Sequence, residues 1–126
     1  MGISLIDAAD DSHVFKVNYW HWRTIVEIIL KLKVLPNGRV EFLNAPFSGH
    51  LSYDEAHQVA QALRGNMLES LKLGERIYMN GKHTMAPDDG TIHTEPDKQH
   101  LNYSISHEEL EEFANYCAEC KGFRVE

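Results

Sequence analysis

The chain has 126 residues, of which 43% are hydrophobic and 25% are charged. This length suits one globular domain over residues 1–126 with a single sizeable core, and the composition excludes disordered and fibrous classes. The formal net charge is −7, from 19 acidic and 12 basic residues, and this balance argues against a nucleic-acid-binding surface, because the phosphate backbone selects clustered Lys and Arg.

The N-terminal residues give no sign of targeting to a membrane. Residues 1–7 lack the basic start and the apolar run of a signal peptide. The most apolar segment, residues 19–34, is too short to span a bilayer and carries several charges. We therefore expect a cytoplasmic protein without a membrane partner, in which Cys117 and Cys120 stay as thiols.

The strongest helix signal lies in residues 19–34, after a short strand predicted over residues 14–17. Apolar side chains recur at three- and four-residue spacing through this segment, which predicts a core helix. Asn18 can cap its first turn, and Pro36 stops it. Its polar stripe, expected to face solvent, consists of Tyr19, Arg23, Glu27 and Lys31.

Residues 39–43 alternate between apolar and polar side chains after an Asn-Gly turn, which predicts a half-buried strand. Further on, Ser52 and Glu55 have the spacing of a capping box, in which the serine caps the helix and the glutamate reaches back to the cap. The apolar residues that follow keep helical spacing. A second helix is therefore predicted over residues 53–72.

Residues 76–85 have the pattern of a hairpin. Asn80-Gly81 is typical of a two-residue turn, and this register places Ile77 opposite Thr84. Residues 86–101 follow, and they contain almost no apolar side chain besides Ile92. We expect this segment to be a long surface loop, and long loops in compact domains often serve function.

The C-terminal part repeats the helix signal. Ser106 and Glu109 have capping-box spacing ahead of a helix predicted over residues 107–121, and residues 123–125 close the chain as an edge strand. The expected fold class is α+β. Three helices, over residues 19–34, 53–72 and 107–121, pack on a small, mostly antiparallel sheet from residues 14–17, 39–43, 76–85 and 123–125.

Two groups of residues could bind a metal. Cys117 and Cys120 form a C-x-x-C pair, but they close a helix, whereas a redox pair opens one, so we interpret them as buried apolar side chains. The sequence also has 8 histidines, several of them in or beside the 86–101 loop. Imidazole and thiolate suit zinc or another divalent first-row metal. The candidate ligands are His83, His93, His100, Cys117 and Cys120.

The start of the first helix offers the best candidate surface for a protein partner. Tyr19, Trp20 and Arg23 are residue types that anchor protein interfaces, although tryptophans at the start of a core helix more often serve packing. Trp20 and Trp22 point in very different directions on a helix, so one can pack in the core while the other flanks it.

The sequence has no G-x-S-x-G, P-loop, G-x-G-x-x-G or H-E-x-x-H motif, so we predict no catalytic residues. The leading hypothesis is a small, acidic, non-enzymatic module without a cofactor that binds a protein, for example an inhibitor or immunity-type protein with a basic target. The alternative is a metal-binding protein or metal-dependent enzyme, which requires at least three of the candidate ligands to converge. A homodimer that covers the apolar helix is compatible with either hypothesis.

Overall fold

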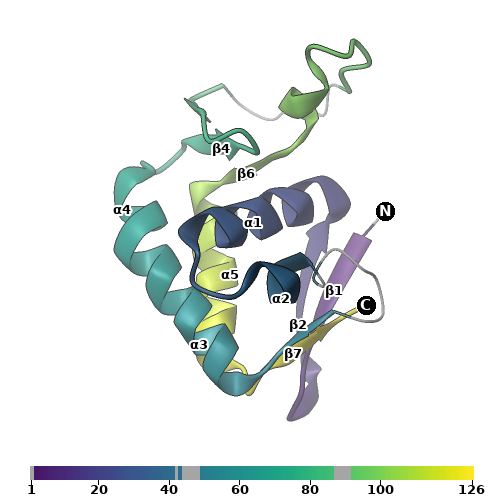
Figure 1. Cartoon of the computed structure of the whole chain (residues 1–126), viewed down its shortest axis with the longest axis vertical. Coiled ribbons are helices and arrows are strands. Elements are labelled where there is room, and N and C mark those ends of the chain that lie inside the picture. The colour runs from purple at the N-terminus through teal and green to yellow at the C-terminus, as the bar shows by residue number, and fades with distance from the viewer. Residues whose placement is uncertain (1, 42, 44–48, 87–91) are drawn as a thin grey trace.

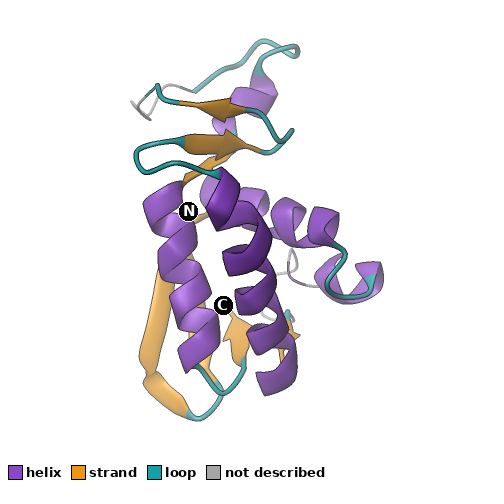
Figure 2. Ribbon diagram, turned by 90° about the vertical axis from the view of Figure 1, so that its left-hand side faces the viewer, coloured by secondary structure: helices purple, strands orange, loops and turns teal. Residues whose placement is uncertain are grey.

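Two antiparallel sheets and a set of helices form an α+β fold, and the computed structural model describes residues 2–41, 43, 49–86 and 92–126. The longer helices lie beside the four-stranded sheet, and the three-stranded sheet lies at one end of them (Figures 1 and 2). This arrangement confirms the α+β class predicted from the sequence.

The four-stranded sheet begins with a hairpin of β1 (Gly2–Asp7) and β2 (Asp10–Asn18). The strand order is β2-β1-β7-β3, where β7 spans Phe123–Val125 and β3 spans His50–Leu51. The sequence predicted only residues 14–17 of this hairpin. It also placed residues 123–125 at an edge, which is wrong because β7 pairs with β1 on one side and β3 on the other.

Helix α1 (Tyr19–Leu32) confirms the predicted core helix. The Asn18 side chain accepts a hydrogen bond from the His21 backbone N–H at 2.7 Å, and Lys33 takes a left-handed conformation at the C-terminal end. Its apolar face is buried inside the chain, including Trp22, Ile25 and Ile29. The described chain itself therefore covers this face, and a second copy is not needed for that purpose.

Residues 37–41 form helix α2 (Asn37–Glu41), so the strand predicted over residues 39–43 is wrong. The Pro36 carbonyl accepts hydrogen bonds from the backbone N–H groups of Arg39 and Val40. Val40 and Leu43 are both fully buried, and their spacing of three places them on one side of a helical turn. Over so few residues an alternating pattern and a helical pattern look alike. Phe42 lies outside the described residues.

Helix α3 (Tyr53–Ala62) continues through a π-helical turn (Leu63–Met67) into α4 (Leu68–Ser70), in agreement with the helix predicted over residues 53–72. The predicted capping box is formed. Ser52 Oγ accepts from the Glu55 backbone N–H at 3.2 Å, and Glu55 Oε1 accepts from the Ser52 backbone N–H at 3.0 Å.

The three-stranded sheet has the order β5-β4-β6, with β4 at Arg76–Tyr78, β5 at His83–Thr84 and β6 at Ser104–Ser106. The predicted hairpin is present, but its register differs by one residue, because Ile77 lies opposite His83. The Tyr78 backbone N–H donates to the Lys82 carbonyl, so residues 79–81 form the turn, and Gly81 takes a φ of 91° there. Glycine adopts this backbone conformation without strain.

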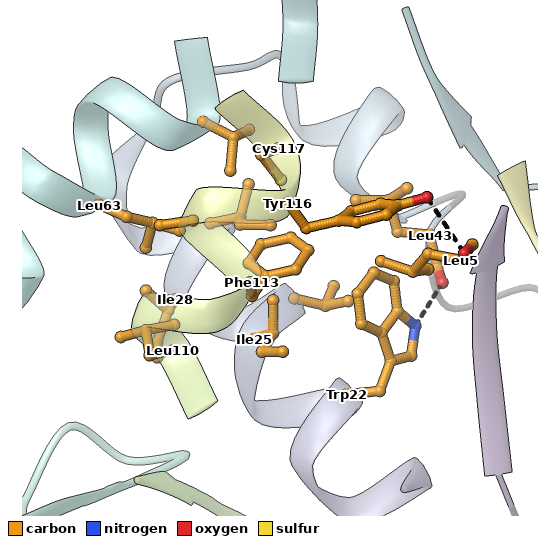
Figure 3. Packing of buried hydrophobic residues seen from close by; sticks show 14 of the residues in the cluster. Leu5, Trp22, Ile25, Ile28, Leu43, Leu63, Leu110, Phe113, Tyr116 and Cys117 are labelled. Atoms are coloured by element: carbon orange, nitrogen blue, oxygen red, sulfur yellow. Dashed lines mark hydrogen bonds between the residues drawn. The ribbon is translucent and has the colours of Figure 1, made fainter. Parts of the chain in front are cut away.

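Helix α5 (His107–Glu119) packs against α3 and completes the core (Figure 3). Phe113 contacts Trp22 and Phe123 in edge-to-face geometry, with ring centroids 6.0 and 6.3 Å apart. The two polar atoms of the large buried side chains are paired: Trp22 Nε1 donates to the Leu43 carbonyl, and the Tyr116 hydroxyl donates to the Leu5 carbonyl. No described helix is long and apolar enough to cross a membrane.

Candidate functional site

The three residues predicted to contact a partner form one cluster with Tyr103, the residue that precedes β6. The Trp20 and Tyr103 ring centroids are 4.9 Å apart in edge-to-face geometry. The Arg23 guanidinium lies 5.9 Å from the Tyr19 ring centroid and 5.8 Å from that of Tyr103, and Nη1 donates to the Tyr19 hydroxyl at 3.0 Å. Each of these side chains is partly buried.

The position of β6 and the β4–β5 turn explains this burial. α1 presents Tyr19 and Arg23 one turn apart on the same side, and the Tyr103 ring packs over that side. Farther along the helix, Lys31 Nζ donates to the Met79 carbonyl at 2.8 Å. Within the polar stripe expected to face solvent, Arg23 is thus partly covered by Tyr103 next to β6, whereas Lys31 reaches the β4–β5 turn but stays exposed. Sequence periodicity assigned this stripe to solvent because it shows only which side of the helix is apolar. It does not show that the three-stranded sheet and its flanking residues pack near the polar side.

Beside this cluster the surface is hollowed to about 320 Å³. Ile92 lies at this hollow with 59% of its surface exposed, which is high for a large apolar side chain. Of the three predicted contact residues, only Trp20 lines the space. The hollow is lined by Trp20, Ile92, His93, Thr94, Gln99, Asn102 and Tyr103.

Asn102 fixes the loop that forms the other side of the hollow. Its Oδ1 accepts from the His93 backbone N–H at 2.7 Å, and its Nδ2 donates to the His93 carbonyl at 2.9 Å. The amide thereby pairs with the main chain in the way a neighbouring strand would, and it holds Ile92 and His93 close to Tyr103. Part of the predicted 86–101 loop is fixed in this way. Residues 87–91 lie outside the described part of the chain.

The residues that line the hollow favour the binding of an uncharged group over proton transfer or the binding of a charged group. Its large apolar or aromatic side chains are Trp20, Ile92 and Tyr103, and its other lining residues are His93, Thr94, Gln99 and Asn102. Among the residues that the structure describes, no Asp, Glu, Lys or Arg lines it. Aromatic surface beside neutral hydrogen-bonding groups suits an apolar side chain together with the main chain that carries it. The sequence indicated Trp20 as a contact residue and marked Ile92 only as the isolated apolar residue of a polar loop. Nothing in it indicated that Ile92, Asn102 and Tyr103 join Trp20.

The candidate metal ligands lie in different parts of the fold. His83 is on β5, where its Nδ1 lies 2.9 Å from Glu75 Oε1, and His93 lines the hollow. His100 is in a short 3₁₀ turn (Gln99–Asn102). Among the residues that the structure describes, no three His, Cys, Asp or Glu side chains come together in a group that could hold a metal ion.

Cys117 on α5 and Cys120, the residue that directly follows this helix, are free thiols packed in the core. Burial raises the pKa of Cys117 well above its ordinary value, and it raises the pKa of Cys120 as well. Cys120 Sγ lies 3.6 Å from the Cys117 carbonyl, to which it donates. Protonated, enclosed thiols are weak nucleophiles and weak metal ligands. Both side chains thus act as small apolar groups, as interpreted from the sequence.

Among the described residues, three histidine–carboxylate pairs closer than 3 Å link separate segments, and each uses Nδ1. The pairs are His13–Asp7 at 2.8 Å, His21–Glu109 at 2.7 Å and His83–Glu75 at 2.9 Å. No short motif marks them in the sequence, because each pair depends on how two elements pack.

Asp7 is the most buried carboxylate of these pairs, with a relative exposure of 3%. Burial raises its pKa, but hydrogen bonds from the Ala9 backbone N–H, the His13 ring and the Lys121 backbone N–H outweigh this effect, so the pKa of Asp7 is lowered. This carboxylate therefore holds the β1–β2 turn against the end of α5. We assign it a structural role.

Comparisons of the chain with protein-family models, with curated proteins and with solved structures find no match.

Proposed function

We propose that the chain is a non-enzymatic protein-binding module, and that the hollow beside Trp20 holds an apolar side chain of its partner. One observation carries the proposal: Trp20, Tyr103 and the exposed Ile92 surround the same hollow of about 320 Å³. Tryptophan and tyrosine provide large contact areas with few rotatable bonds, and they are enriched among the residues that dominate binding energy.

The fixed geometry of the hollow supports this proposal. The two Asn102–His93 hydrogen bonds hold the loop, and the Trp20–Tyr103 contact holds the opposite side. A site that is already ordered loses less conformational entropy when its partner binds. An apolar side chain inserted there would also cover Ile92, which otherwise faces water.

The charge of the chain supports a basic partner. With a net charge of −7, the surface attracts a positively charged protein over a distance and repels acidic ones. Charge thus contributes to association, whereas the hollow provides the short-range contact. An inhibitor or immunity-type protein that captures a basic enzyme or toxin fits this combination. In this proposal the module works in the cytoplasm, where its two free thiols stay reduced.

A selection with a random linear-peptide display library on the immobilised full chain tests the proposal. We expect enriched peptides to share an aromatic or aliphatic anchor flanked by Lys or Arg. Ile92→Asp, which places a charge at the hollow, should abolish their binding.

The matched control is Met85→Asp, because Met85 is 63% exposed but does not line the hollow. This variant should bind the enriched peptides as the wild type does. Peptide enrichment that is equal on the wild type and on Ile92→Asp would contradict the proposal, and so would a library from which no peptide is enriched.

A further inference from the structure

The helix that continues from α3 through the π-helical turn into α4 lies beside α5 (Figure 1). Between these helices the surface is hollowed to about 280 Å³, and we name this space the α4–α5 hollow. It is separate from the hollow beside Trp20, because the two share none of the described residues that line them. The α4–α5 hollow is lined by Arg64, Leu68, Glu69, His107, Glu111 and Asn115.

The π-helical turn brings side chains of opposite charge to the same side of the helix. In this turn the Leu68 backbone N–H donates to the Leu63 carbonyl, five residues earlier instead of four. Each turn therefore contains an extra residue, so Arg64 and Glu69, five apart in the sequence, both line the hollow. π-Helical turns occur frequently at functional sites.

α5 contributes three polar side chains, one from each of three successive turns. His107, Glu111 and Asn115 are four residues apart and so share one side of the helix. Arg64 Nη2 donates to Asn115 Oδ1 at 2.7 Å, which places the guanidinium at the Asn115 end of the hollow. Glu111 lies one turn nearer the start of α5, about 6 Å away along the helix axis.

Glu69 lies toward the start of α5 as well. Arg64 contacts Asn115, and farther along the chain the Gly74 backbone N–H donates to Glu108 Oε1 at 2.9 Å. The two segments therefore run antiparallel, and Glu69 comes after Arg64 in the direction of Gly74. The hollow thus has a basic end and, one helical turn away, an acidic end.

The charged side chains of this hollow are not neutralised by one another. Neither Arg64 nor Glu69 forms an ion pair with any residue of the described ranges. Glu111 Oε2 lies 3.9 Å from His107 Nε2, a distance too long for a hydrogen bond. With a neutral imidazole, two carboxylates and one guanidinium give the hollow one net negative charge.

His107 is the most buried polar side chain of the hollow, with a relative exposure of 8%. Its Nε2 is directed toward the Glu111 carboxylate, and its Nδ1 is enclosed. Neither ring nitrogen has a hydrogen-bond partner in the part of the chain that the structure describes. A buried polar group without a partner costs free energy and is rare in native proteins. A ligand with N–H groups at the acidic end would provide the missing partner.

We propose that the α4–α5 hollow binds an arginine that has a free α-carboxylate. The guanidinium of this ligand lies between Glu69 and Glu111 and donates a hydrogen bond to His107. Its α-carboxylate pairs with Arg64 at the other end. Its methylene groups pack on Leu68 between the two ends.

Arginine fits the hollow in chemistry and in size. A guanidinium has five N–H donors in a planar fork that matches carboxylates, so it can contact two glutamates and an imidazole together. A volume of about 280 Å³ is slightly below the range of pockets for drug-sized molecules, roughly 300–1,000 Å³, and suits a single amino acid. Free arginine and the C-terminal arginine of a peptide both carry these two charged ends.

Two-dimensional NMR of the full chain during titration with L-arginine tests the proposal. L-arginine should cause saturable shifts of the backbone amides that line the hollow. Agmatine, which lacks the carboxylate, and citrulline, whose side chain is uncharged, should each bind about tenfold more weakly or less, because one charge-assisted contact is lost.

The peptide Gly-Gly-Arg and its C-terminal amide identify the source of the ligand. Tighter binding of L-arginine than of Gly-Gly-Arg would indicate the free amino acid. Tighter binding of Gly-Gly-Arg, lost in its amide, would indicate the C-terminus of a peptide. No saturable binding of either compound would overturn the proposal.

Two substitutions separate the ends of the ligand. Arg64→Gln should weaken L-arginine about tenfold and should not weaken agmatine, because only the carboxylate contacts this side chain. Glu111→Gln should weaken both compounds. Binding of L-arginine that is insensitive to both substitutions would contradict the proposed site.

Glu112→Gln is the matched control. It makes the same change one residue along α5, at an exposed side chain that does not line the hollow, so it should leave binding unchanged. Ile92→Asp should also leave it unchanged, so failure of the proposed partner site beside Trp20 and failure of the arginine site can be told apart.

Discussion

His21 Nδ1 lies 2.7 Å from Glu109 Oε2, and this contact joins the first turns of α1 and α5. The sequence spacing assigned the Glu109 carboxylate to a capping box with Ser106. Ser106 does cap α5, because its Oγ accepts from the Glu109 backbone N–H. The Glu109 side chain instead pairs with a residue 88 positions away. This pair holds the start of α1, and therefore Trp20, in place.

The His21–Glu109 pair should contribute to stability as a coupled unit. His21→Ala and Glu109→Gln should each lower the free energy of unfolding, and a double-mutant cycle should give a coupling of about 1 kcal/mol. Urea unfolding measures each value. Glu112→Gln, on the exposed side of the same helix, should have little effect. Fully additive single effects would show that the pair is not coupled.

Glu55 should make the free energy of unfolding depend on pH in the acidic range. Hydrogen bonds from the Arg39 side chain lower the pKa of Glu55 to about 2 from an ordinary value of 4.5, with a further contribution from the Ser52 backbone N–H. A lowered folded-state pKa stabilises the fold above the ordinary value, and this stabilisation is lost as pH falls from about 4.5 toward 2.

Glu55→Gln should therefore lower the free energy of unfolding by about 1–3 kcal/mol at neutral pH and by less near pH 3. Urea unfolding at both pH values measures the difference. Glu112→Gln is again the control, because it makes the same change of charge on an exposed side chain. If Glu55→Gln lowered the free energy of unfolding by the same amount at both pH values, the lowered pKa of Glu55 would be contradicted.

Gly122 lies where β7 and the start of α3 approach each other. It takes a φ of 94°, and an added Cβ would lie 2.7 Å from the Leu51 carbonyl oxygen. Gly122→Ala combines backbone strain with a main-chain clash, so it should lower the free energy of unfolding by about 2 kcal/mol or more. Gly38→Ala, within α2 and with open space around it, should be neutral or slightly stabilising. Similar effects of the two changes would contradict the packing described.

The two thiols should be unreactive in the folded protein. Cys117 and Cys120 are fully buried, and burial raises the pKa of both. A chromogenic disulfide reagent should label neither residue under native conditions and both in denaturant, at rates set by unfolding. Fast labelling of the native protein would show that α5 opens locally at its C-terminal end.

Much of the fold could be predicted because local signals and tertiary contacts agree in the longer helices. Asn18 and Ser52 cap α1 and α3 as their spacing predicted. The errors arise where neighbouring elements decide the structure. β7 has too few residues to indicate that it lies inside a sheet, and Val40 and Leu43 fit a helical turn as well as a strand.

The site was only partly predictable for a similar reason. Trp20 was identified as an aromatic residue at a helix start. Ile92 was noted as an isolated apolar residue in a polar loop, but that signal alone did not make it a site residue. The contact with Tyr103 depends on how β6 packs against α1. The Asn102–His93 pair depends on the path of the loop, which sequence patterns do not encode.

The proposed binding hollow can be tested most directly by two-dimensional NMR of the full chain during titration with the peptide most enriched in the display selection. We expect the signals of the Trp20 indole and of the backbone amides of Ile92, His93 and Asn102 to shift together and saturate. The Trp22 indole provides an internal control, because its N–H is buried against the Leu43 carbonyl and should not move. Saturable shifts on the β2 edge or along α5, with Trp20 unchanged, would contradict the assignment of the hollow as the binding site.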